Sequence, residues 1–206
     1  MSIVSYNNRS ISSITAIPGT AKSLTHIKTL TASSDSTLSF VNGSSDVVLD
    51  STYPIYIFKF INIHPASDNS TFEVGFRDGS TDYDATKTTT FFWAYHDEAD
   101  SETSLGYLAS RDLAQGTGFT DLSGSVGNGS DESCSGELTL FNPSSTTFVK
   151  HFVSRCCTYN HGIVGMEDEF VAGYFNVTGA IDEVSFKMSS GNVDAGTIKM
   201  YGLKDS

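Results

Sequence analysis

The chain has 206 residues and a formal net charge of −12, from 24 acidic and 12 basic residues. This acidic balance disfavours a nucleic-acid partner, which needs a positive face, and also docking on an anionic membrane surface. The composition is 38% hydrophobic and only 17% charged, with 14 Phe and 9 Tyr, which is typical of an all-β protein with polar loops and too aromatic for a disordered chain.

The cysteines and the first residues indicate where the protein is made. Three cysteines cannot form a closed disulfide framework, and the adjacent Cys156 and Cys157 would point to opposite faces of a strand. We therefore expect a chain that is reduced when made. The opening MSIVSYNNRS has no basic region followed by an apolar run, and no run reaches membrane-spanning length, so we expect neither a secretory signal nor membrane insertion.

Residues 1–22 form a distinct N-terminal segment, which Pro18 and Gly19 end as a turn. Two interpretations stay open: a frayed terminus, or an arm for docking and oligomerisation. The apolar residues that would contact a neighbouring subunit or another protein are Ile3, Ile11, Ile14 and Ile17. Residues 23–206 contain no linker and no internal repeat, so we expect them to form a single β-sandwich domain.

Short runs of β-branched and aromatic residues follow one another along this domain, separated by Gly, Asn, Asp or Pro. In the run 71–77, Phe72, Val74 and Phe76 alternate with polar or small residues, which predicts a half-buried strand. About ten strands are expected, a spacing typical of a jelly-roll-like β-sandwich. They cover 26–32, 37–41, 53–63, 71–77, 88–95, 136–141, 147–155, 170–176 and two runs within 180–203.

The run 53–63 is almost continuously apolar, which predicts a central strand buried on both faces. The last two strands, within 180–203, are separated by SSGNVDAG, which is too long for a two-residue turn. They are therefore a looped hairpin or a crossing between sheets, and we expect the final strand to pack on 53–63. The segment 96–120 stays open between a short helix, with Leu105, Leu108 and Leu113 on one face, and an irregular crossing loop.

Two groups of residues could in principle bind a metal ion, one acidic and one with thiols and imidazoles. The spacing of the residues supports a metal site in neither group. The carboxylates Asp97, Glu98, Asp100 and Glu102 match no EF-hand loop, so a solvated loop is the better interpretation, although calcium binding is left open. The run 167–169 is interpreted in the same way. The potential zinc ligands Cys156, Cys157 and His161, with His151 nearby, are wrongly spaced for a tetrahedral ion, so we expect no metal and no other cofactor.

The sequence offers no catalytic residues. It contains no Gly-x-Ser-x-Gly elbow and no phosphate-binding loop, and no carboxylate pair stands out for glycoside hydrolysis. We therefore expect a protein that is not an enzyme. Exposed aromatics are candidates for stacking on sugar rings, although aromatics of a β-rich chain lie more often in the core. The candidates are Tyr83, Tyr107 and Tyr159.

Five segments together closely resemble a family of virion structural proteins of marine tailed bacteriophages, the cyanophages and their relatives. The resemblance extends over nearly the whole chain and rests on long runs rather than on single residues. The segments are NNRSISSITAIPG (7–19), YIFKFINIHPASD (56–68), FFWAYHDEADSETSLGYLA (91–109), LFNPSSTTFVKHF (140–152) and AGYFNVTGAIDEVSFKMSSGNVDAGTIKMYGL (172–203).

The resemblance implies a jelly-roll or β-sandwich subunit exposed on the phage particle, made in the host bacterial cytoplasm and located in the virion. It brings no catalytic residues. The expected role is a capsid decoration or cement subunit that forms a homo-oligomer, by analogy a trimer, and contacts the major capsid protein or the tail. The alternative is a tail-fibre or tail-appendage module that recognises host-surface carbohydrate. A fibre needs a long shaft or repeat, and none is visible.

Overall fold

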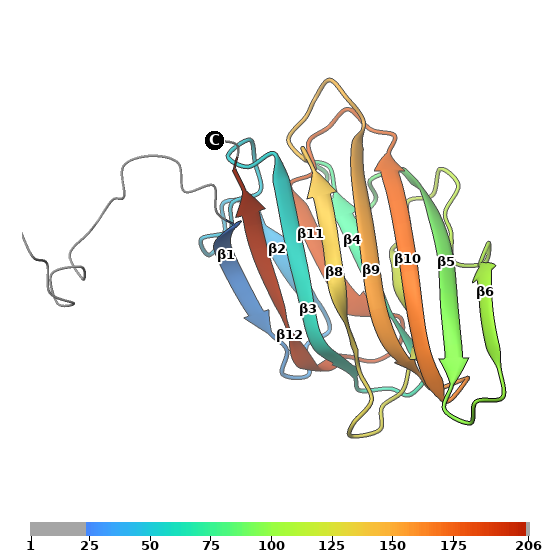
Figure 1. The fold of residues 1–206 in the computed structure, drawn as a ribbon. Coiled ribbons are helices and arrows are strands. Elements are labelled where there is room, and N and C mark those ends of the chain that lie inside the picture. The colour runs from blue at the N-terminus through green and yellow to red at the C-terminus, as the bar shows by residue number, and fades with distance from the viewer. Residues whose placement is uncertain (1–23, 205–206) are drawn as a thin grey trace, which may run out of the picture.

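A computed structural model of the protein describes residues 24–204. The fold is all-β, with 12 antiparallel strands that form one nearly closed, barrel-like sheet (Figure 1). The expected all-β class is therefore confirmed, with two strands more than the sequence predicts. In the described residues, no helix is both long and apolar enough to cross a membrane. The expected N-terminal arm, 1–22, lies outside this range.

The strands form a wide layer and a narrow layer that face each other (Figure 1). A bridge between Val126 and Asn160 joins the two layers at one edge of the narrow layer. The wide layer has the spatial order β6 (Thr103–Tyr107), β5 (Lys87–Asp97), β10 (Gly165–Phe175), β9 (Lys150–Asn160), β8 (Cys134–Phe141), β3 (Ile55–Pro65), β12 (Val193–Leu203) and β1 (Leu24–Thr31). The narrow layer has the order β7 (Thr120–Val126), β4 (Ser70–Arg77), β11 (Glu183–Met188) and β2 (Leu38–Val41).

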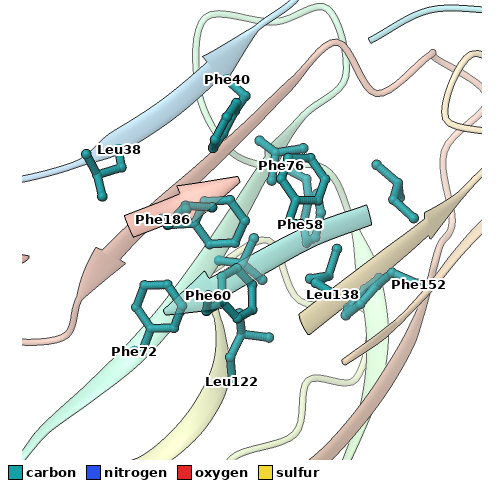
Figure 2. Close-up of a cluster of buried hydrophobic side chains, with 14 of the residues drawn as sticks. Leu38, Phe40, Phe58, Phe60, Phe72, Phe76, Leu122, Leu138, Phe152 and Phe186 are labelled. Carbon is teal, nitrogen blue, oxygen red and sulfur yellow. The ribbon is translucent and has the colours of Figure 1, made fainter. Parts of the chain in front are cut away.

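The core lies between the two layers, and phenylalanine is its most frequent residue type (Figure 2). Phe186 of β11 is its centre: its ring centroid lies 5.2 Å from that of Phe60 and 5.7 Å from that of Phe72. The predicted inward residues of β4, which are Phe72, Val74 and Phe76, are all fully buried. Burying each large apolar side chain contributes roughly 1.5–3 kcal/mol, which makes this cluster the main source of stability.

The structure confirms the predicted place of the C-terminal strands and corrects one detail of the strand beneath them. β11 belongs to the narrow layer and β12 to the wide layer, so the chain crosses between layers, and β12 pairs with β3 as expected. β3 lies in the interior of the wide layer but is not buried on both faces. Tyr56 and Phe58 are buried, whereas Lys59 faces outward and is only half-buried, because the narrow layer covers one side.

The sequence analysis does not predict two of the strands, β6 and β7, which are short and rich in Ser, Thr and Gly. The helix considered within 96–120 is wrong. Its central part is β6, which pairs with β5 and places Leu105 opposite Ala94. β7 carries the sequence TDLSGSV, with Leu122 and Val126 buried. Both strands are held by their neighbours rather than by strong local preference, which is why local pattern misses them.

Candidate functional site

The outward face of the wide layer results from the alternation of its strands. In β9, Phe152 and Cys156 point into the core, and Val153 and Arg155 point outward. Residues directly opposite each other in paired strands lie on the same face. The register therefore places Arg155 beside Phe170 of β10, Phe170 beside Phe92 of β5, and Phe92 beside Tyr107 of β6. We call these four residues the aromatic row.

Three side chains of the aromatic row, Phe92, Phe170 and Arg155, are stacked. The Phe92 and Phe170 ring centroids are 4.8 Å apart, with an angle of 3° between the planes. On the other side of Phe170, the Arg155 guanidinium carbon lies 4.7 Å from the ring centroid. Arg155 is fixed by two hydrogen bonds to Asp168, Nε to Oδ1 at 2.9 Å and Nη2 to Oδ2 at 2.7 Å. The row is thus pre-organised, which lowers the entropy cost of binding a partner.

The stacking leaves Phe170 no free ring face. Phe92 lies on one side of the ring and Arg155 on the other, so a sugar ring cannot stack flat on Phe170. Its exposed part is the ring edge. Edges and aliphatic side chains suit contact with another apolar protein surface better than they suit a sugar platform.

Exposed apolar side chains continue the aromatic row across the wide layer. Leu105 of β6 is 73% exposed, an unusual value for a large apolar residue. We define the outer apolar face as Phe92, Leu105, Tyr107, Phe141, Val153 and Phe170. Between β5, β10 and β9 the same side holds a shallow groove of about 370 Å³, lined mainly by Thr88, Thr90, His151, Val153, Ala172 and Tyr174. Exposed apolar side chains gathered on one face of a sheet mark a candidate interaction site.

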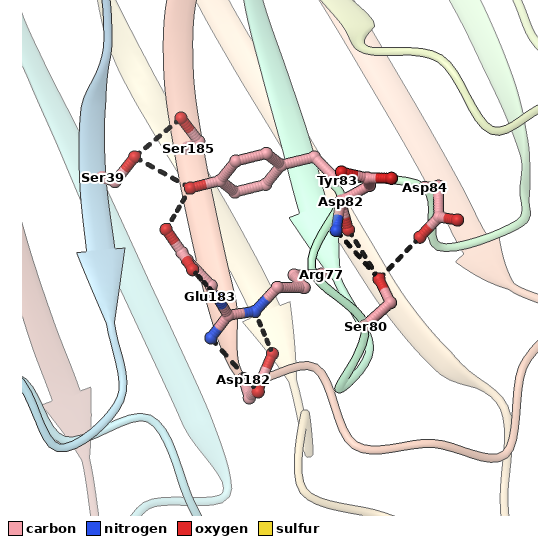
Figure 3. A network of polar contacts seen from close by, with 9 residues as sticks. All are labelled: Ser39, Arg77, Ser80, Asp82, Tyr83, Asp84, Asp182, Glu183 and Ser185. Carbon is pink, nitrogen blue, oxygen red and sulfur yellow. Dashed lines mark hydrogen bonds and ion pairs between the residues drawn. The ribbon is translucent and has the colours of Figure 1, made fainter.

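The three candidate aromatics end in different environments. Tyr107 is 54% exposed and belongs to the outer apolar face. Tyr159 is half-buried and lines a pocket at the β5–β6 end of the sheet. Tyr83 is not a surface platform: its hydroxyl donates to Glu183 and lies 3.0 Å from Ser39 Oγ, within the network of Figure 3. Burial and the bond to Glu183 raise the Tyr83 pKa.

The structure does not bring the potential zinc ligands together. Cys156 points into the core and Cys157 points outward, as expected for adjacent strand residues. His151 and His161 lie near opposite ends of β9, so about ten residues of strand, or roughly 33 Å, separate them. The acidic cluster around Asp97 forms the β5–β6 turn, where the backbone N–H groups of Ser101 and Glu102 both donate to Asp97 Oδ1 at 2.9 Å.

The solvated loop expected for 167–169 is wrong, because these residues belong to β10. Asp168 faces outward, but Glu167 and Glu169 point inward and are buried. Glu169 Oε1 accepts from Gly124 N at 2.5 Å, and its Oε2 accepts from the Thr158 hydroxyl at 3.1 Å. The signal that could have found the pair is the period-two pattern of 170–176, which continues backward through Glu169 and Glu167.

The two buried glutamates join β10 to β7 and β9. Glu167 accepts from the Asn160 amide, and a Cβ on Gly124 would lie 2.3 Å from Glu167 Oε2. A side chain at position 124 would therefore displace the Glu167 carboxylate from its place beside β7. Burial is the main cause that raises the pKa of Glu169 well above its usual value, and burial also raises the pKa of Glu167. Their hydrogen-bond partners are protein groups, which indicates a structural role.

The raised pKa of Glu169 predicts that the contribution of this residue to stability falls as pH rises. The folded state holds the Glu169 proton more tightly than the unfolded state, so the stabilising contribution is complete below pH 4.5 and is lost as pH rises through the folded pKa. We expect Glu169→Gln to raise the urea midpoint at pH 8 and to change it less at pH 4.5. The outward-facing Asp168→Asn is the control. An equal shift for Glu169→Gln at both pH values would contradict this.

Comparison with known proteins adds no family to these observations. The chain matches no protein-family model, no curated protein and no solved structure.

Proposed function

We propose that this chain is a non-enzymatic structural protein on the exterior of a tailed-phage virion, a capsid decoration or cement subunit. The observation that carries the proposal is the outer apolar face, which the chain leaves exposed although its net charge is −12. Such a face needs a protein partner to cover it. The long segments that resemble marine tailed-phage virion proteins support a phage particle as the place where that partner lies.

The proposal includes a homo-oligomer, by analogy a trimer, with residues 1–22 as the docking arm. The arm carries Ile3, Ile11, Ile14 and Ile17 and is basic: Arg9 and Lys22 are its only charged side chains. The rest of the chain therefore holds all 24 acidic and 10 of the 12 basic residues, a net charge of −14. This charge difference favours an arm that contacts the acidic body of a neighbouring copy.

We also propose that the barrel-like sheet is a variant of the jelly roll. The support is the path of the chain, which crosses from one layer to the other at most connections. For example, β3 is in the wide layer, β4 in the narrow layer and β5 in the wide layer again. Such alternation between two facing sheets is typical of jelly-roll subunits in viral particles.

A second candidate function is a tail-appendage module that binds host-surface carbohydrate. One observation favours it: a pocket of about 420 Å³ beside the acidic β5–β6 turn. It combines an aromatic ring, Tyr159, with the polar groups of His96, Asp97 and Glu98. Sugar sites use this combination of stacking and hydrogen bonding. The covered faces of Phe170 make the protein-binding proposal the stronger one.

The proposal predicts that the chain co-sediments with purified virions that lack it, and that this binding needs both the arm and the outer apolar face. We expect deletion of 1–22, and separately Leu105→Ser combined with Phe92→Ser, to weaken binding at least tenfold. Ile61→Ser is the matched control, because Ile61 is an exposed apolar residue of β3 that is not one of the six residues of that face. A density map of the intact virion gives the position directly.

Three outcomes would overturn parts of this proposal. Absence of the chain from the virion map would refute the structural role. If the protein without 1–22 keeps its oligomeric mass in light scattering and its place on the particle, the segment is a frayed terminus. Glycan binding in an array screen, abolished by Tyr159→Ala and combined with absence from the capsid, would select the receptor-binding alternative.

A further inference from the structure

Three loops meet at the end of the barrel-like sheet drawn at the bottom of Figure 1. Asp68 lies in the β3–β4 loop, Glu132 lies in the β7–β8 loop, and His161 directly follows β9. Together they offer two carboxylate oxygens and one imidazole nitrogen within 4.8 Å of one another. We call these three residues the three-loop cluster. They lie far apart in the sequence, and only the fold brings them together.

Each carboxylate of the three-loop cluster is oriented by backbone groups. Asp68 Oδ1 accepts from Asn69 N at 3.0 Å and from Asn128 N at 3.2 Å, which leaves Oδ2 facing His161 Nε2 at 3.3 Å. Glu132 Oε2 accepts from Gly129 N at 2.6 Å, which leaves Oε1 3.9 Å from His161 Nδ1. One oxygen of each acid is therefore occupied, and the other faces the imidazole.

The main chain around the imidazole is also fixed. His161 N donates to Ser125 O of β7 at 2.9 Å, and Gly162 N donates to the Asn160 side chain at 2.8 Å. On the second loop, Glu132 O lies 2.7 Å from His64 Nδ1 of β3. The cluster is thus attached to three strands of the sheet and not only to loop backbone. Pre-organised ligands bind an ion with a smaller loss of entropy.

We propose that the three-loop cluster binds one first-row divalent transition-metal ion, for which Zn²⁺ is the probe. A tetrahedral ion with ligands at about 2.1 Å holds them about 3.4 Å apart, close to the 3.3 Å between Asp68 Oδ2 and His161 Nε2. The Glu132 ligand atom lies within 4.8 Å of the other two ligand atoms, so coordination by all three residues requires the Glu132 carboxylate to shift toward the ion. Water completes the coordination, since Asp68 and His161 are both about half exposed.

The ligand set selects the class of ion. Imidazole with carboxylate suits zinc and its first-row neighbours, whereas calcium takes six to eight oxygen ligands and magnesium keeps most of its waters. The competing interpretation is a simple ion pair between a protonated His161 and the two acids. The bound ion ties the β3–β4, β7–β8 and β9–β10 loops together at one end of the sheet. This inference does not rest on the proposed function.

The test is titration of the full chain with ZnCl₂ by calorimetry, with thermal unfolding as a second readout. Every protein carries Cys157→Ser, which removes the one exposed thiol of the described residues. We expect one equivalent of zinc to bind. At a free zinc concentration 100-fold above the dissociation constant, the melting temperature should rise by roughly 5–10 °C. EDTA should reverse the rise.

The variants separate a metal site from an ion pair. His161→Ala and Asp68→Asn should each weaken zinc binding at least tenfold. Asp68→Asn keeps Oδ1 as an acceptor for the two backbone N–H groups and loses only the free carboxylate oxygen. His96→Ala is the matched control, because its ring lies 3.1 Å from Asp100 in an exposed pair of the same kind.

Three results would overturn the proposal. Absence of binding up to millimolar zinc means that the cluster is an ion pair only. Zinc binding that survives His161→Ala, or that His96→Ala removes, places the ion elsewhere. A thermal shift with CaCl₂ but none with ZnCl₂ refutes the transition-metal assignment.

Discussion

Lys87→Met is expected to stabilise the protein by about 2 kcal/mol at pH 7. Lys87 begins β5, points into the core and is fully buried. Its ammonium donates one hydrogen bond, to Ala85 O at 3.2 Å. Burial lowers the pKa of Lys87 to about 8, from an ordinary value of 10.5. That difference corresponds to about 3 kcal/mol of destabilisation while the folded protein holds the charge, and loss of the bond to Ala85 O offsets about 1 kcal/mol.

The stability gain from Lys87→Met should depend on pH, because the folded and unfolded chains release the Lys87 proton at different pH values. Below pH 8 both the folded and the unfolded chain carry the Lys87 proton, so the folded chain bears the full penalty. As pH rises from 8 to 10.5, the folded chain releases the proton and the penalty disappears. The advantage of Lys87→Met in urea unfolding should therefore shrink across that range. An advantage that is independent of pH would show that Lys87 is not charged in the folded protein.

Lys150 provides the matched control, because it is a second buried lysine with a different environment. Its ammonium donates to three backbone carbonyls, Val177 O at 2.8 Å, Gly179 O at 2.5 Å and Ser145 O at 3.3 Å. Lys150→Met leaves these acceptors without their donor, which costs roughly 1–3 kcal/mol for a buried group. The same substitution should thus stabilise at position 87 and destabilise at position 150.

The strands that the sequence predicts well are those whose own residues carry a strong pattern. β4 alternates Phe72, Val74 and Phe76, and the structure buries all three. By contrast, the segment around Leu105 has the pattern of a short helix or an irregular loop, and it becomes β6 because it pairs with the edge of β5. β7 is similar, since Gly124 matters there for the close approach of Glu167. These outcomes depend on neighbours distant in sequence, which local pattern cannot contain.

The sequence also could not predict how the residues of the candidate surfaces come together. The sequence identifies Tyr107 as a candidate but gives no reason to join it to Phe92 and Phe170, because their contact depends on strand register. The three-loop cluster is even less visible, since its residues are 64 and 29 positions apart, from Asp68 to Glu132 and from Glu132 to His161. Alternation predicts which residues share a face of one strand. It does not predict which strands are neighbours.

The largest loss of stability is expected for Phe186→Ala, about 3–5 kcal/mol. Phe186 is fully buried on β11 and forms ring contacts with both layers: with Phe72 of β4, and with Phe58 and Phe60 of β3. The truncation removes the transfer free energy of the ring and leaves a cavity that the surrounding strands cannot readily fill. A domain of this kind has a total stability of about 5–15 kcal/mol, so the loss is a large fraction of it.

Phe148→Ala is the control for Phe186→Ala, because it separates the effect of burial from that of the chemical change. It is the same chemical change at a position that is 72% exposed, so we expect a shift of less than about 0.5 kcal/mol. Urea unfolding of both variants and the unaltered chain measures the difference, and an unchanged m-value shows that the denatured state is comparable. Because Phe186 packs between the layers, its truncation should lower the midpoint of the whole transition and not release one layer alone. If Phe186→Ala costs less than about 1 kcal/mol, or if Phe148→Ala costs as much, the phenylalanine cluster is not what holds the two layers together.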